Sequence, residues 1–432
     1  DNFAQMFASM DDAYMQGRAA DVKDVSERVL DILCGVSNGT REMTEPCIVA
    51  ADDLAPSETV QLDKEKVLGF ATMYGSSNSH TAILARTMNI PAVIGMGEAL
   101  NPKYDGEMAI IDGFTGTLYV DPDEETLAKM QEKRAKDLEQ KELLNQLKGK
   151  ENVTKSGQKI NVYANIGNVS DLGAVLKNDA GGVGLFRSEF LYLENSTYPT
   201  EEQQFQVYRL AAEAMGMKKV VIRTADLGGE KTAECLDLGE ENNPEMGYRG
   251  IRVSLDKDEI FKTQLRAILR ASAYGKMSIM FPMVTDVKEV QQAKLLLEKI
   301  KKELKDEKIP FNEEIQIGVM IETAAAGMIS GELAREADFF SIGTNDLTQL
   351  TLGMDRTNSK LDHFYNPHHP ALLKMIRIIA NNVHLEGKTI SICGDLAADL
   401  DMTEQFLQMG IDELSVAPNQ VLALRKKIRE IQ

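Results

Sequence analysis

A rhythm of strand, loop and helix repeats from residue 151 to the end of the chain, and it limits the possible folds more than any other feature. Eight short apolar runs, each separated from the next by a helical pattern, occur within 151–432. Eight such units favour a (β/α)8 barrel of the TIM type within an α/β chain. The strands are predicted at 160–166, 183–187, 220–225, 278–284, 317–321, 339–342, 390–393 and 414–417. A further run at 250–255 could be a ninth strand, and we assign it to the elaboration between the third and fourth strands.

The first part of the chain has a different pattern. Apolar residues in 1–35 fall mostly at helical spacing, and the segment begins abruptly, as the end of a larger helical unit would. Residues 36–120 alternate short apolar runs with turns around one helix, which indicates a small α/β domain. Residues 121–150 are highly charged with a thin apolar stripe, which favours a solvated linker helix or, as an alternative, a coiled-coil partner helix.

Charge and cysteine content exclude several classes of protein. The formal net charge is −19, from 48 Lys and Arg against 67 Asp and Glu, which argues against binding to nucleic acid or an anionic membrane. No apolar run reaches the ~18 residues of a membrane span, and no signal peptide is visible. The four cysteines form no close pair or zinc-type spacing, so we expect a reduced, cytoplasmic protein.

Polar side chains follow the predicted barrel strands, where such barrels place their chemistry. Glu322 and Asp346 follow two successive strands, and two carboxylates completed by substrate and water suit Mg²⁺. Ordinary surface carboxylates are the alternative. Arginine side chains at one mouth suit a substrate with a phosphate and a carboxylate, although salt bridges to local acidic groups are equally possible. These arginines are Arg187, Arg223 and Arg356 on the rim and Arg249 on a nearby loop.

Two further residues are candidates for chemistry. Cys393 ends a strand, where it is either a small buried hydrophobe or a general acid. His80 begins a helix, whose free N–H groups would stabilise a phosphoryl group on the imidazole. Alternatively, Ser79 is a simple N-cap and His80 is idle. The remaining histidines, at 363, 368, 369 and 384, are interpreted as loop and helix-end residues, with a metal cluster at the first three as the alternative.

Several long segments resemble a known family. NSHTAILARTMNIPAVIG is similar to the phosphohistidine motif of the phosphoenolpyruvate-utilising enzymes. Six later segments resemble successive barrel motifs of the enzyme I family of the bacterial phosphoenolpyruvate:sugar phosphotransferase system: GLFRSEFLYL, IRTADLGGEK, GYRGIR, GVMIETAAA, FFSIGTNDLTQLTLGMDR and ICGDLAAD. MDDAYMQGRAADVKDVSERVL resembles the end of that family's helical HPr-docking subdomain. The likeness covers essentially the whole chain.

The resemblance implies a division of labour among domains. It makes 1–35 a remnant of the docking subdomain, 36–120 a swivelling phosphohistidine domain, 121–150 a linker helix and 151–432 a barrel that binds phosphoenolpyruvate. It implies a homodimer formed through the barrel. The charged linker fits a carrier domain that leaves the barrel to meet HPr.

The resemblance also implies roles for single residues. His80 would accept the phosphoryl group, release pyruvate and pass the group to HPr, with Thr59 orienting the imidazole. Glu322 and Asp346 would bind Mg²⁺. Cys393 would protonate the enolate. Arg187, Arg223 and Arg356 would clamp the phosphate and carboxylate of the substrate, with Asn345 at the phosphate.

The chain also departs from the family. Gly75-Ser76-Ser77-Asn78-Ser79-His80 stands where the family commonly has Gly-Gly-x-Thr-Ser-His, so Ser76 replaces a glycine and Asn78 a threonine. Asp395 replaces a glutamate, Ala324 replaces a proline, and Ala417-Pro418 replaces a polar stretch. The family has a further stretch before the position of Asp1, so we expect a fragment that is phosphorylated by phosphoenolpyruvate but transfers poorly to HPr. The alternatives are a nitrogen-system paralogue, an enzyme like pyruvate phosphate dikinase or phosphoenolpyruvate synthase, and a non-catalytic phosphoenolpyruvate sensor.

Overall fold

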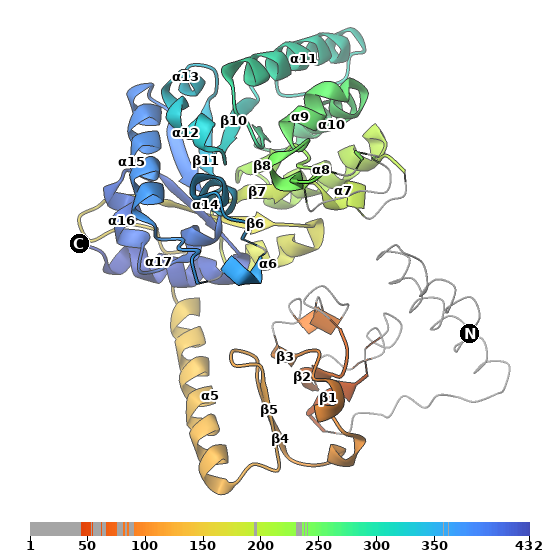
Figure 1. Ribbon diagram of the computed structural model, residues 1–432, viewed down its shortest axis with the longest axis vertical. Coiled ribbons are helices and arrows are strands. Elements are labelled where there is room, and N and C mark those ends of the chain that lie inside the picture. The colour runs from red at the N-terminus through yellow and green to blue at the C-terminus, as the bar shows by residue number, and fades with distance from the viewer. Residues whose placement is uncertain are drawn as a thin grey trace, which may run out of the picture. The chain divides into compact units, whose positions relative to one another are not determined.

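The computed structural model describes residues 45–432, apart from 53, 55–61, 63–65, 76–80, 83, 86–89, 194–196, 230–235, 237, 240, 357 and 362. The chain divides into two compact units, Asp1–Gln140 and Lys141–Gln432 (Figure 1). The helical segment expected at 1–35 lies outside the described residues.

The first unit contains a small parallel sheet and a hairpin. Strands β1 (Cys47–Ala51), β2 (Val67–Thr72) and β3 (Ala92–Val93) lie side by side in that order. Strands β4 (Ala109–Asp112) and β5 (Thr117–Val120) pair in antiparallel fashion. Its buried core consists of Leu54, Val67, Phe70 and Ala85, with partly buried neighbours around them.

The predicted linker helix is present as α5 (Glu124–Asn145), and none of its residues is buried. Two glutamates occupy its first turn, where the helix dipole favours negative charge. The N–H of Thr126 donates to Asp123 at 2.7 Å and so caps the helix start. Lys133 reaches the hairpin, where its Nζ lies 2.6 Å from the carboxylate of Asp112. A helix this polar follows from a sequence with only a thin apolar stripe.

The second unit is a closed barrel of eight parallel strands in chain order, with β13 pairing back to β6. This confirms the predicted (β/α)8 fold and all eight predicted strands. The strands are β6 (Asn161–Ile166), β7 (Val183–Arg187), β8 (Val220–Arg223), β9 (Met277–Phe281), β10 (Gln316–Ile321), β11 (Phe339–Ile342), β12 (Thr389–Ile392) and β13 (Glu413–Val416).

The candidate ninth strand is a helix, so that interpretation was wrong. Gly250 has φ 61°, and the chain then turns directly into α9 (Ile251–Asp256). Ile251, Val253 and Ser254 are buried, whereas Arg252 is half-exposed, a spacing that one helical turn explains better than strict alternation. The segment does lie between β8 and β9, as the assignment to an elaboration expected.

Helices surround the barrel (Figure 1). Two of the longer ones begin with reciprocal capping boxes, Thr200 with Gln203 before α8 and Asp286 with Glu289 before α11. The helices are α6 (Leu172–Lys177), α7 (Phe190–Leu193), α8 (Glu201–Met215), α9, α10 (Asp258–Ala271), α11 (Val287–Asp306), α12 (Ala324–Met328), α13 (Ser330–Ala334), α14 (Thr344–Leu352), α15 (Pro370–Leu385), α16 (Thr403–Gln408) and α17 (Val421–Glu430).

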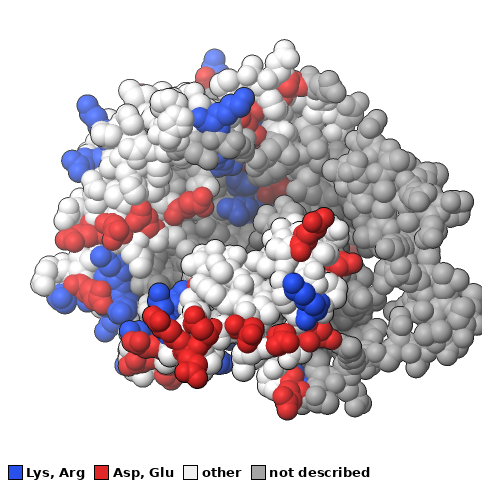
Figure 2. All heavy atoms as spheres, turned by 60° about the horizontal axis from the view of Figure 1, so that its bottom comes forward, with Lys and Arg blue, Asp and Glu red and all other residues white. Residues whose placement is uncertain are grey.

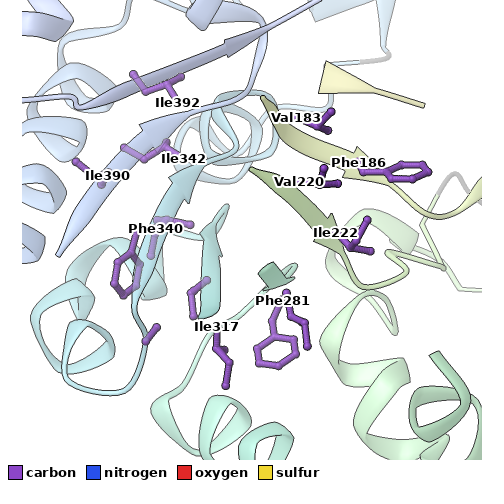
Figure 3. Packing of buried hydrophobic residues seen from close by; sticks show 14 of the residues in the cluster. Val183, Phe186, Val220, Ile222, Phe281, Ile317, Phe340, Ile342, Ile390 and Ile392 are labelled. Atoms are coloured by element: carbon purple, nitrogen blue, oxygen red, sulfur yellow. The ribbon is translucent and has the colours of Figure 1, made fainter. Parts of the chain in front are cut away.

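The barrel strands bury two separate apolar faces. Alternate residues such as Val220 and Ile222 belong to the large cluster between strands and helices (Figure 3). A second cluster fills the barrel interior with one residue from each of six strands or strand ends: Leu185, Val221, Met280, Met320, Phe339 and Cys393. The residues two positions after Val221 and Met320 share this inner face and lie at the carboxyl ends of β8 and β10.

Acidic side chains form rows on one face of the described surface. Figure 2 shows them in extended rows on the visible face, which matches the formal net charge of −19. Among the described residues, no helix is both long enough and apolar enough to cross a membrane.

Candidate active site

The inner face of the barrel brings the predicted charged residues to one mouth. Arg223 follows the interior residue Val221 by two positions, and Glu322 follows Met320 in the same way. Arg187 and Arg223 are paired in register where β7 and β8 end. The strand pattern therefore places these side chains together although they are far apart in the sequence.

Arg223 lies in a buried cage of carboxylates. Its Nη2 is 3.0 Å from Glu189, and its Nη1 is 3.5 Å from Asp226 and 3.6 Å from Glu322. Burial alone would lower the pKa of Arg223, but these carboxylates outweigh that effect and raise it. The buried Nε has no hydrogen-bond partner among the described residues.

Arg249 is held against two of the same acidic groups. Its Nε and Nη2 contact the two oxygens of Asp226 at 3.3 and 2.8 Å, which is a forked arrangement. Its Nη1 contacts Asp346 at 3.1 Å and also pairs with Glu245. Arg249 reaches the mouth because Gly250 comes close to Met283, so its loop lies against the end of β9.

The buried carboxyl of Glu322 lies within the electrostatic influence of Asp346. Burial of the Glu322 carboxyl and the nearby charge of Asp346 raise its pKa. The N–H of Met283 donates to Glu322 at 2.8 Å, and Met283 adopts φ 56° to do so. Gly343 lies directly against this side chain, because a Cβ there would be 2.7 Å from Cγ of Glu322. These contacts fix one orientation of the carboxylate.

The carboxylate pair has the chemistry of a divalent-cation site. Both groups offer the oxygen ligands that Mg²⁺ prefers, and a bound cation would relieve the mutual repulsion that raises the Glu322 pKa. The described residues contain no cluster of three or more His, Cys, Asp or Glu side chains suited to a metal.

Cys393 belongs to the interior cluster, and its residue is only 2% exposed. Burial raises the pKa of its thiol to about 11, so the thiol stays protonated at neutral pH. The Sγ lies 3.6 Å from the carbonyl oxygen of Ile342, and Asn165 donates to the Cys393 carbonyl at 2.9 Å. Gly394 comes so close to Thr344 that no side chain fits there.

Three other predicted site residues occupy the same rim. The side chain of Asn345 accepts a hydrogen bond from the N–H of Asp395 at 2.8 Å and so joins the loops after β11 and β12. Arg356 is half-buried with its Nη1 3.8 Å from Asp346. Arg187 is exposed, and no described residue forms an ion pair with it. His80 and Thr59 lie outside the described residues, and their roles stay predictions.

The other histidines have ordinary roles in the described structure. His368 pairs with Asp399 at 2.6 Å, and His384 with Asp412 at 2.9 Å. His369 caps α15 by accepting from the N–H of Ala371.

Glu189, Asp226 and Glu245 were assigned no role from the sequence. Glu189 accepts from Arg223 and from the N–H of Asp226 at 2.8 Å, so it fixes both. Their position directly after β7 and β8 was the available signal. For Glu245 the only signal in the sequence was its position four residues before Arg249, the spacing of neighbours on a helix.

Fold and site together define an α/β-barrel enzyme with a cationic and acidic mouth suited to a small, highly anionic substrate. Two family models match the chain: the phosphoenolpyruvate-utilising enzyme PEP-binding domain at 141–432 and the mobile domain of the same enzymes at 43–116. The class is therefore that of the phosphoenolpyruvate-utilising enzymes.

Individual relatives narrow the class further. The phosphoenolpyruvate-protein phosphotransferase of Staphylococcus carnosus is 43% identical over 99% of this chain and 75% of the relative. That of Priestia megaterium is 42% identical over the same shares. An NMR solution structure of Enzyme I is 40% identical, with a TM-score of 0.26 over 31% of this chain and 55% of that one. The chain belongs to the phosphoenolpyruvate-protein phosphotransferase family, which confirms the resemblance.

Proposed function

We propose that this chain transfers the phosphoryl group of phosphoenolpyruvate to its own His80 and releases pyruvate. The observation that carries the proposal is the convergence of Arg223, Arg249, Glu322, Asp346 and Cys393 at one mouth of a barrel from this family. In the reaction, the phosphoryl P–O bond breaks and a P–N bond forms on the imidazole. The enolate left behind takes a proton at its methylene carbon to become pyruvate.

The arginines supply the positive charge that binds the anionic substrate. Phosphoryl transfer depends mainly on positioning and charge stabilisation, and guanidinium groups offer paired donors to phosphate and carboxylate oxygens. Arg223 and Arg249 are held rigidly by Glu189 and Asp226, so little reorganisation accompanies binding. Arg187 ends β7 at the rim, and Arg356 lies near Asp346, the residue that follows Asn345.

Glu322 and Asp346 would hold Mg²⁺. When bound, the ion would neutralise charge on the phosphoryl oxygens. The chain itself fixes the Glu322 carboxylate through the N–H of Met283. Gly343 lies against the same side chain and so excludes other orientations of the carboxylate.

Cys393 would be the acid that protonates the enolate. A thiol kept neutral by burial still carries its proton at the pH of the cell, which an acid must do. After transfer, the thiolate would regain a proton from solvent once pyruvate leaves. Asp395, the departure beside this residue, still offers its backbone N–H to Asn345, so the change from glutamate leaves that contact intact.

His80 would carry the phosphoryl group away from the barrel, with Thr59 orienting the imidazole. HPr would be the next acceptor of the phosphoryl group. The barrel would form the interface of a homodimer. The protein would work in the cytoplasm. Because an attacking imidazole must be neutral, transfer should weaken as the pH falls through the ordinary histidine pKa of ~6.5.

Incubation with phosphoenolpyruvate labelled in its phosphoryl group tests the proposal. We expect acid-labile label and an equal amount of pyruvate from the parent chain with Mg²⁺. The His80→Ala variant should take no label, and the His384→Ala variant should match the parent, because His384 pairs with Asp412 away from the mouth. Label that persists in His80→Ala would reject the proposed acceptor.

A further inference from the structure

Arg249 carries one more acidic partner than its orientation requires. Asp226 holds the guanidinium by two atoms, Nε and Nη2, and this fork alone fixes the plane of the group. Both hydrogens of the remaining nitrogen, Nη1, are directed at Asp346 and Glu245. Asp346 belongs to the proposed cation site, whereas Glu245 has no part in it.

Glu245 approaches Arg249 from the solvent side. It lies in the short 3-10 helix Pro244–Met246, in the segment between β8 and α9. Its side chain is 21% exposed, against 4% for Arg249 and 1% for Asp226. Gly229, at φ 65°, makes room for it, because a Cβ there would lie 2.6 Å from Oε1 of Glu245. The carboxylate therefore occupies the outward end of the guanidinium, where a substrate anion would arrive.

The charges around Arg249 support the same view of the Glu245 carboxylate. The proposed cation would bind Glu322 and Asp346, while Glu189 pairs with Arg223 and Asp226 pairs with Arg249, so Glu245 adds a further carboxylate beside Arg249. A carboxylate on an arginine donor has the same chemistry as the carboxylate of phosphoenolpyruvate.

We propose that Glu245 mimics the substrate carboxylate on Arg249 Nη1, and that the substrate must displace it in order to bind. Glu245 is thus an affinity-setting residue for the anionic substrate. It pairs with the guanidinium when the site is empty, and it lowers affinity without taking part in phosphoryl transfer. This inference rests on the proposed function, because it takes Arg249 as a substrate ligand.

The Glu245→Gln variant tests the inference, because it removes the charge and keeps the size. We expect the KM for phosphoenolpyruvate to fall at least about threefold, the scale of a partly exposed ion pair, with kcat within about twofold of the parent. Glu245→Ala should show the same direction. Glu241→Gln is the matched control, because Glu241 lies in the same segment and accepts from the N–H of Tyr248. Its KM should stay at the parent value.

An independent binding readout separates the two hypotheses. In the His80→Ala background, which cannot accept the phosphoryl group, calorimetry should show tighter phosphoenolpyruvate binding for Glu245→Gln. An unchanged or higher KM and Kd in both Glu245 variants, with a normally labelled parent chain, would overturn the inference, and a rise would make Glu245 a positioning residue. A parent chain that takes no label would instead reject the proposed function.

Discussion

A single methyl group at Gly343 should disable the proposed cation site while leaving the barrel folded. Gly343 has φ −82° and ψ 84°, which an alanine can adopt, so the substitution Gly343→Ala introduces no backbone strain. The added Cβ would lie 2.7 Å from Cγ and 2.9 Å from Oε1 of Glu322. Glu322 has to move, because the main chain sets the position of an alanine Cβ and leaves it no other place.

The structure sets the size of both effects. Overpacking of this kind costs about 1–3 kcal/mol of unfolding free energy. A carboxylate displaced by about 1 Å loses its bond to the Met283 N–H and its approach to Arg223, and misplacement on this scale costs on the order of 100-fold in rate. The loss of rate should therefore exceed what the modest loss of stability explains.

The assay combines urea unfolding with the rate of label transfer from phosphoenolpyruvate. Gly173→Ala is the matched control, because a Cβ at Gly173 meets no atom within 4 Å and an alanine favours its helix. We expect the control to equal the parent in rate and to be at least as stable. A Gly343→Ala variant with the parent's rate would refute the argument that this glycine orients Glu322.

Two further predictions concern buried groups. Because burial raises the pKa of Cys393 to about 11, iodoacetamide at pH 8 should alkylate it far more slowly than the half-buried Cys47, and peptide mass spectrometry would show equal rates if the thiol were exposed or ionised. The Arg425→Met substitution should lower the unfolding free energy of the barrel by about 2–4 kcal/mol, because it leaves the Asp179 carboxylate and two carbonyl groups without their buried partner. Arg429→Met, which removes only an exposed contact to the Glu151 carbonyl, should change it by less than about 0.5 kcal/mol, and equal losses would contradict this account.

The eight strands could be predicted because each is a short apolar run bounded by polar turns, and errors were confined to the ends. The strand expected at 278–284 ends at Phe281 because Pro282 has no N–H to donate and Met283 gives its own to Glu322. The strand expected at 220–225 ends at Arg223, because the N–H of Ala225 donates to the Gln264 side chain. In both places a side chain replaces the neighbouring strand as hydrogen-bond partner.

Only the site residues that directly follow a predicted strand could be placed at the barrel mouth from the sequence. Arg223 and Glu322 follow strands directly, so the barrel rule alone places them at one mouth. The carboxylates that hold the arginines could not be assigned from the sequence, because their partners depend on how loops fold back. Glu245 shows this most clearly, since its i, i+4 spacing from Arg249 predicts a contact only within a continuous helix, and here the 3-10 helix ends at Met246.

Binding of phosphoenolpyruvate to the barrel without transfer tests the central claim most directly. Calorimetry on the His80→Ala variant isolates binding, and Glu322→Gln in the same background removes one proposed cation ligand. The account predicts binding that requires Mg²⁺ and is lost in the double variant. Equal affinity with and without Mg²⁺, or with Glu322 replaced, would contradict it.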